Sequence, residues 1–200
     1  MAALTSAAAA VAAAQESHLS LSAGSPENDW RPAVRPVRLL ADSSLVRALR
    51  SGLPLRFHFE LELWHDRWLS DALVDRTNWF LILYQEPLSG QFSLSRSWDP
   101  GVQEWFDSLG EAARALDRWY QASLERPEPG DGTYYYEARL RVEILSLGDL
   151  AELEHWLKGE VRGDGDLGGA VTRGLKRLFI RMIGLSARKY EARTAPFRPE

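Results

Sequence analysis

The chain of 200 residues contains no cysteine. Disulfide bonds, thiolate metal sites and thiol nucleophiles are therefore excluded. No uninterrupted apolar run reaches the ~20 residues that a membrane-spanning helix needs. The sequence also lacks the Gly-x-Ser-x-Gly motif of serine hydrolases and the Gly-x-x-x-x-Gly-Lys-[Ser/Thr] phosphate loop. What remains is an ordinary globular composition, with 45% apolar and 26% charged residues.

Excess positive charge is also lacking. The formal net charge is −4, so no nucleic-acid partner is expected, because nucleic acid requires a basic surface. The charge is unevenly distributed, however. Residues 170–200 carry a net charge of +6, and residues 1–169 carry −10. The basic end can therefore lie on the acidic part of the protein or bind an anionic surface.

The N-terminus reads "MAALTSAAAAVAAAQES". We interpret residues 1–14 as the apolar part of a truncated secretory signal with a small-residue site at Ala12–Ala14, although no basic leader precedes it. The alternative is a disordered Ala-rich tail. Residues 15–33 are rich in Ser, Pro and Ala and predict a flexible lead-in. We therefore expect an exported, periplasmic or envelope-associated protein in which residues 1–33 add no packed structure.

Periodicity defines the elements of the remaining chain. Apolar and polar residues alternate over residues 53–66 and over residues 133–145, and both segments predict half-buried strands. Residues 76–86 are apolar on both faces from Trp79 to Tyr84, and they form a hairpin with residues 91–96. A short strand is expected within residues 36–42. Amphipathic patterns with capping residues predict helices, which are expected over residues 43–52, 108–126, 146–159 and 170–190. The expected caps are Ser43 or Ser44 for the first helix and Ser108 for the second.

These elements predict the α+β class: a mostly antiparallel β-sheet or sandwich of about five strands, with two to three packed amphipathic helices. We expect one domain over residues 34–160, followed by a glycine-rich connector at 161–169. A basic amphipathic helix and tail are expected over residues 170–200.

The polar faces of the two long strands carry the first candidate site. If the strands are antiparallel neighbours, Glu60 and Glu62 lie near Arg139 and Arg141. In the expected register, His58 faces Glu143 and Glu60 faces Arg141. Cross-strand pairs of opposite charge contribute about 0.2–1 kcal/mol each. A metal site would need a third ligand from elsewhere. We therefore interpret this face as an ion-paired sheet surface and expect no catalytic, metal or cofactor site.

Two other surfaces are candidates for binding. Exposed tryptophans can stack on sugars or form an interface, and the tryptophans considered are Trp64, Trp68, Trp98 and Trp105. The C-terminal helix presents an apolar stripe opposite a basic face, which is typical of a helix that lies on a membrane. Its candidate contact residues are Arg173, Lys176, Arg177, Phe179, Arg181 and Met182. The alternative in each case is structural, with the tryptophans closing the core and the helix docking on the protein's own sheet.

Four segments in this order resemble an uncharacterised family of exported bacterial proteins, domain-of-unknown-function family 4390. They are "LRSGLPLRFHFELELWHDRW", "WFLILYQEPLSGQFSL", "SLGEAARAL" and "YYYEARLRVEILSL". The resemblance implies a secretory signal and an envelope location. It implies no activity and supplies no functional residues.

Three functions remain open. The first is a non-catalytic envelope module that binds a protein partner or an anionic membrane surface. The second is a small-ligand or glycan-binding module that uses a Trp-rich surface, and the third is an uncharacterised enzyme.

Overall fold

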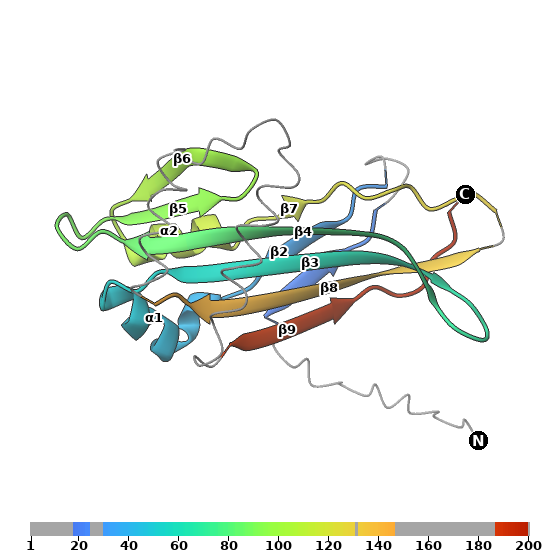
Figure 1. Ribbon diagram of the computed structural model, residues 1–200, viewed down its shortest axis with the longest axis horizontal. Coiled ribbons are helices and arrows are strands. Elements are labelled where there is room, and N and C mark those ends of the chain that lie inside the picture. Colours follow the sequence, from blue (N-terminus) through green and yellow to red (C-terminus); the bar gives the residue numbers. More distant parts are fainter. Residues whose placement is uncertain (1–17, 25–29, 131, 147–186, 200) are drawn as a thin grey trace, which may run out of the picture.

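The computed structural model describes residues 18–24, 30–130, 132–146 and 187–199, which form a two-layer antiparallel β structure (Figure 1). The strands of the larger sheet are β3 (Leu55–Asp66), β4 (Ala72–Gln85), β5 (Phe92–Arg96), β6 (Asp99–Phe106), β8 (Thr133–Ile144) and β9 (Arg188–Arg193). The strands of the smaller sheet are β1 (Leu19–Ser22), β2 (Ala33–Pro36) and β7 (Tyr120–Gln121). The strand orders are β6-β5-β4-β3-β8-β9 and β1-β2-β7. The antiparallel architecture is as expected, but nine strands are described where about five were predicted.

The central strand β3 confirms the alternation in the sequence. The apolar residues at alternate positions from 55 to 63 face the core and are at most 1% exposed, and they are Leu55, Phe57, Phe59, Leu61 and Leu63. Full burial of one such side chain is worth about 1.5–3 kcal/mol. Strand β8 is its antiparallel neighbour, as predicted, but Glu60 lies opposite Arg139 and not Arg141. The expected register was wrong by two residues. Alternation determines which face a side chain occupies and leaves shifts of two residues undetermined.

The two α-helices in the described part of the chain begin at capping residues. In α1 (Ser43–Arg50), the carboxylate of Asp42 accepts the Ser44 N–H at 2.8 Å, so the cap precedes the expected Ser43 or Ser44. In α2 (Leu109–Leu116), Ser108 Oγ accepts the Glu111 N–H at 3.2 Å, as predicted.

The prediction that the second helix runs to residue 126 was wrong. The helix ends at Leu116, and Tyr120 leaves it to pair with Val34 of β2. The Tyr120 hydroxyl donates to the carbonyl oxygens of Ala115 and Leu116 at 3.1 Å. Tyr120 was expected on the apolar stripe of a longer helix, but it lies beyond the last turn of α2 and bonds to the end of that helix. The strand expected over residues 36–42 was also wrong. Strand β2 ends at Pro36, and a 3₁₀ turn, η2 (Leu39–Ala41), follows.

The predicted flexible lead-in over residues 15–33 was wrong where the structure describes it. Strand β1 pairs with β2, and Leu19 is only 1% exposed. The ring of Trp30 stacks on Phe197 at 5.8 Å. The sequence "LSLS" alternates between apolar and polar residues as a strand does. The strand was not predicted because this short alternation lies in a Ser-rich segment, which was interpreted as flexible. The expected signal at residues 1–14 lies outside the described residues.

The C-terminal helix expected to reach Tyr190 was wrong from residue 188 onward. Strand β9 pairs with β8, and Tyr190 lies opposite Leu140. Arg188 forms an ion pair with Asp42, and its guanidinium donates to Ser44 Oγ at 2.5 Å, so β9 is tied to the start of α1. The rest of that helix, the connector at 161–169 and the helix expected over 146–159 (from residue 147 onward) fall outside the described residues.

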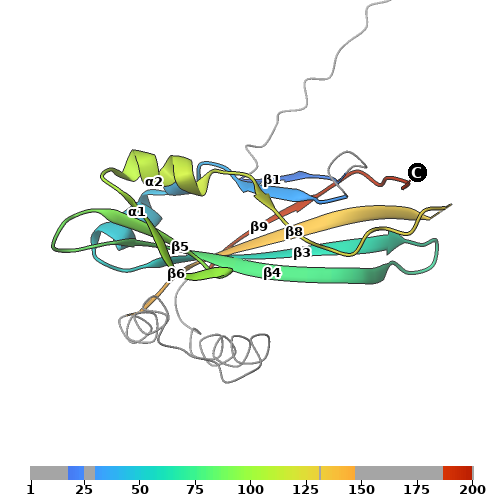
Figure 2. The ribbon, with the colours of Figure 1, turned by 90° about the horizontal axis from the view of Figure 1, so that it is seen from above.

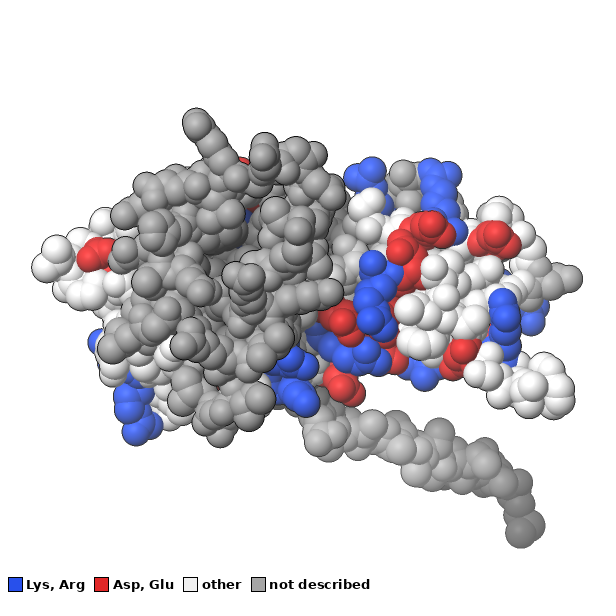
Figure 3. Space-filling view, in the orientation of Figure 1, with Lys and Arg blue, Asp and Glu red and all other residues white. Residues whose placement is uncertain are grey.

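The smaller sheet and both α-helices cover one face of the larger sheet (Figure 2). One apolar core fills the space between the layers and includes Leu19, Phe59, Leu116 and Tyr136. On the opposite face of the larger sheet, basic and acidic side chains are interleaved (Figure 3). No helix in the described part of the chain is long and apolar enough to span a membrane.

Candidate functional site: an aromatic groove beside the open edge of β4

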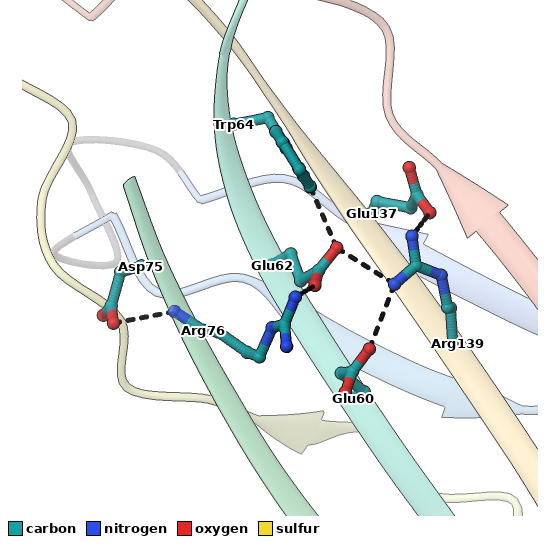
Figure 4. Close-up of polar contacts among 7 residues, drawn as sticks. All are labelled: Glu60, Glu62, Trp64, Asp75, Arg76, Glu137 and Arg139. Atoms are coloured by element: carbon teal, nitrogen blue, oxygen red, sulfur yellow. Dashed lines mark hydrogen bonds and ion pairs between the residues drawn. The ribbon is translucent and has the colours of Figure 1, made fainter. Parts of the chain in front are cut away.

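The polar face of the larger sheet is an ion-pair ladder centred on Glu62 of β3 (Figure 4). The carboxylate of Glu62 is buried, at 1% exposure, and it pairs with Arg76 and with Arg139 Nη1 at 3.2 Å. It also accepts the indole N–H of Trp64 at 3.0 Å. Among the described residues, the charged partners of Glu62 are therefore side chains of the same sheet, which is the arrangement of a structural network.

The rest of that face has the same character. Arg56 and Glu143 are both buried and form a two-pronged contact, with Nε at 2.9 Å and Nη2 at 2.5 Å from the carboxylate. Burial, followed by the charge of Arg56, lowers the pKa of His58 below its ordinary value. Among the described residues, no three His, Asp or Glu side chains gather into a metal-binding cluster. The face supports the ion-paired interpretation.

The four candidate tryptophans do not form one surface. Trp64 stacks on Tyr135 at 6.4 Å, and Trp68 is 96% exposed in the turn between β3 and β4. Trp98 and Trp105 are about half exposed. Glu104 lies on the core side with Leu94, so Trp105, the next residue, points to the opposite face. Of these four residues, Trp98 lines the groove described below. The six candidate residues between Arg173 and Met182 lie outside the described residues.

That groove exists because β5 is much shorter than β4. Strand β5 pairs with β4 only from Leu81 to Gln85. Over residues 72–79, no described strand pairs with the edge of β4 that faces away from β3. Figure 1 shows β4 running well beyond the ends of β5 and β6. An exposed edge of this kind presents unpaired backbone groups to any extended chain that approaches it.

The free backbone groups can be assigned to individual residues. Phe80 donates its N–H to Ser97 Oγ and accepts the Ser97 N–H, both at 3.0 Å, so its backbone points away from β3. Asn78 is two residues away in an unbroken register with β3, and its N–H and C=O therefore point in the same direction. Asn78 is exposed. The Arg76 N–H, by contrast, donates to the Asp75 carboxylate at 2.7 Å.

A groove of about 630 Å³ runs beside this edge. One wall is β4 from Thr77 to Phe80, and the other is the segment from Arg118 to Ser123, with Trp98 at one end. This volume is in the range of ligand pockets. Near the other end of the edge, the Glu125 N–H donates to Asp75 Oδ2 at 2.7 Å and holds the connecting segment against β4.

The groove is lined with aromatic rings held in fixed positions. Trp79 stacks on Phe59 at 5.2 Å, and Trp98 meets the edge of Tyr120 at 6.1 Å. Burial raises the pKa of Tyr120 to about 12, so its hydroxyl stays neutral and keeps its bonds to α2. Trp119 adds a half-exposed ring. Rigid aromatic walls of this kind are typical of binding sites.

One polar atom in the groove wall has no partner. Trp79 is only 8% exposed, and its indole Nε1 makes no hydrogen bond. A buried donor left unpaired costs about 1–3 kcal/mol. Trp79 lines the groove, whereas its Nε1 is itself buried away from solvent.

Charge in the groove is positive. Arg96 and Arg118 both line it, and both pair with Glu104, with Arg118 Nη1 at 3.0 Å from the carboxylate. Arg96 also lies over the Trp98 ring at 5.9 Å. None of the described lining residues is Asp or Glu. Two guanidinium groups thus share one carboxylate, and the groove is complementary to an acceptor or an anion.

Sequence reasoning identified Trp98 here but missed Asn78, Trp79, Arg96, Arg118 and Trp119. Trp119 had been assigned to a continuous helix, and the groove forms only because that helix ends at Leu116. The one usable signal was length, because the segment that became β4 is far longer than its hairpin partner β5.

The comparisons with known proteins identify a family. The model of DUF4390, a domain of unknown function, matches residues 36–153. The chain belongs to the DUF4390 family. No curated protein and no solved structure matches the chain. Within the DUF4390 match lie the open edge of β4 and the whole groove, whereas β1 and β9 lie outside it.

Proposed function

We propose that this DUF4390 protein is a non-catalytic module of the cell envelope that binds a protein partner by accepting an extended segment of that partner at the open edge of β4. The observation that carries the proposal is the outward-pointing backbone of Asn78 beside an aromatic groove. An added strand would take the place beside residues 76–79 that β5 occupies beside residues 81–85.

Strand addition is a general mode of peptide recognition, in which main-chain hydrogen bonds position the peptide and side-chain pockets select it. Both parts are present here, and they are continuous in space because the same residues of β4 supply the edge and a wall of the groove. The exported location is part of the proposal and rests on the Ala-rich N-terminal segment and the family resemblance.

The test uses a random 12-residue peptide library displayed on phage and selected against the full chain. The affinities of the selected peptides are then measured for the native chain, for Asn78→Pro and for Asn78→Ala, which is the matched control. Proline removes the outward N–H without removing a bond to β3, whereas alanine keeps that N–H. We expect peptides that bind the native chain and Asn78→Ala but lose at least tenfold affinity for a folded Asn78→Pro.

The proposal fails if no peptide is selected, or if Asn78→Pro is folded and binds the peptides as well as the native chain does. Thermal unfolding of each variant establishes whether it is folded. If Asn78→Pro does not fold, exchange protection of the Asn78 amide in the native chain on peptide binding decides instead.

A small-ligand or glycan-binding module is the second candidate, and the half-exposed rings of Trp98 and Trp119 in the groove favour it. Such a ligand would compete with the selected peptides, but its affinity for Asn78→Pro would equal its affinity for the native chain. Binding to an anionic membrane through residues 170–186 has no geometric support, because those residues lie outside the described part of the chain.

A further inference from the structure

Few backbone groups at the open edge of β4 are free, and this limits the hydrogen bonds that the backbone can make to an added strand. Asn78 offers an N–H and a C=O, while the Arg76 N–H is already bonded to Asp75 and the Phe80 backbone to Ser97. A net backbone hydrogen bond is worth about 0.5–1.5 kcal/mol. Affinity for a strand added here must therefore come mainly from side chains that enter the groove.

We propose that the captured segment is acidic and aromatic: a planar apolar side chain of the segment lies between the aromatic walls of the groove, and a nearby carboxylate of the same segment pairs with Arg118. This inference deepens the proposed function and rests on it.

The aromatic part follows from the walls. Trp98 is 54% exposed and Trp119 is 49% exposed, although both line a concave site. A planar side chain placed between them would bury apolar surface on both sides. Aromatic pairs at 4.5–7 Å gain about 0.5–1.5 kcal/mol beyond the area they bury.

The acidic part follows from the charges. Arg118 is half exposed and shares Glu104 with Arg96, so one guanidinium of the pair lacks a carboxylate of its own. No described lining residue is acidic. Neutral or basic segments leave these donors unmatched, so the groove discriminates against them.

The composition of the phage-selected peptides provides the first readout. We expect Asp or Glu within two residues of Trp, Tyr or Phe in most sequences. A synthetic peptide of the commonest sequence is then measured against Arg118→Gln, with Arg50→Gln as the control. Arg50 is an exposed arginine at the end of α1, away from the groove, so the two variants change net charge equally.

We expect Arg118→Gln to weaken binding about three- to tenfold and Arg50→Gln to leave it unchanged. Replacing the acidic residue of the peptide by its amide should weaken binding to the native chain by the same factor and have no added effect on Arg118→Gln. Peptides that are sensitive to Asn78→Pro but lack acidic and aromatic residues, or bind Arg118→Gln equally well, would overturn this inference while leaving strand addition intact. Loss of all peptide binding would overturn the proposed function itself.

Discussion

Arg139 Nη1 of β8 lies 3.0 Å from Glu60 Oε1 of β3, directly across the central strand pair. The same guanidinium reaches Glu62 and Glu137, so one cation serves three carboxylates. Glu62 and Glu137 lie opposite each other in the ladder, and like charges in that position are destabilising unless a cation lies between them. Arg139 therefore stabilises the polar face by offsetting the repulsion among these carboxylates.

Arg139→Met should destabilise the protein by about 1–3 kcal/mol, because it leaves the buried Glu62 with one cation fewer. Urea unfolding followed by tryptophan fluorescence measures the change. Glu60→Gln is the control. Its carboxylate is more exposed than that of Glu62, and we expect a loss below about 1 kcal/mol. Equal losses from both substitutions would contradict the role assigned to Arg139.

The alternation of apolar and polar residues made the central strands of the larger sheet predictable, but it did not reveal the edge strand β9. Strands β3 and β8, their antiparallel pairing and the proximity of Arg139 to Glu60 and Glu62 followed from residue types at a period of two. The register did not follow, since a shift of two residues preserves every face. Strand β9 was not predicted because "RKYEAR" continues the basic helical pattern that precedes it. The structure shows instead that Tyr190 and Ala192 pack against the core.

The groove was less predictable than the sheet. It depends on where β5 stops, where α2 ends and how Tyr120 docks, and none of these has a local signature. Trp98 could be suspected as an exposed aromatic, but the unpaired Nε1 of Trp79 is visible only in three dimensions.

The pH dependence of stability should report the bonds that the Asp42 carboxylate makes to Ser44 and Arg188. Hydrogen bonding to Ser44, together with Arg188, lowers the Asp42 pKa from 3.8 to about 2. The ionised carboxylate therefore stabilises the folded state fully above about pH 4, and this contribution is lost as the pH falls toward 2. Asp42→Asn keeps a good helix cap and removes the charge. The urea midpoints of the native chain and this variant should differ most at neutral pH and converge by pH 2, and a constant difference would contradict the assignment.

His58 should make stability fall in mildly acidic solution. Burial, followed by Arg56 and Arg141, lowers the pKa of His58 below 6.5, against the opposing charges of Glu143 and Glu60. The unfolded chain thus takes up a proton at a pH where the folded chain does not, so stability is full above about pH 6.5 and declines below it. His58→Gln should remove this part of the slope between pH 7.5 and 5.5. An unchanged slope would show that other groups cause it.

Trp68 should matter neither for stability nor for the groove. It is 96% exposed in the β3–β4 turn, whereas Trp79 is 8% exposed and stacks on Phe59. Trp68→Ser should leave the unfolding free energy within about 0.5 kcal/mol of the native value, and peptide affinity unchanged. Trp79→Ala should cost about 3–5 kcal/mol. Loss of peptide binding in Trp68→Ser would move the binding site to the hairpin turn.

The amide of Asn78 tests strand addition most directly. Hydrogen exchange at single-residue resolution, measured on the full chain with and without a phage-selected peptide, compares Asn78 with Phe80, whose N–H already donates to Ser97. We predict that Asn78 exchanges rapidly in the free chain and is protected at least tenfold by the peptide, while Phe80 changes little. Saturating peptide that leaves the Asn78 amide as fast as in the free chain would contradict recognition at the edge of β4.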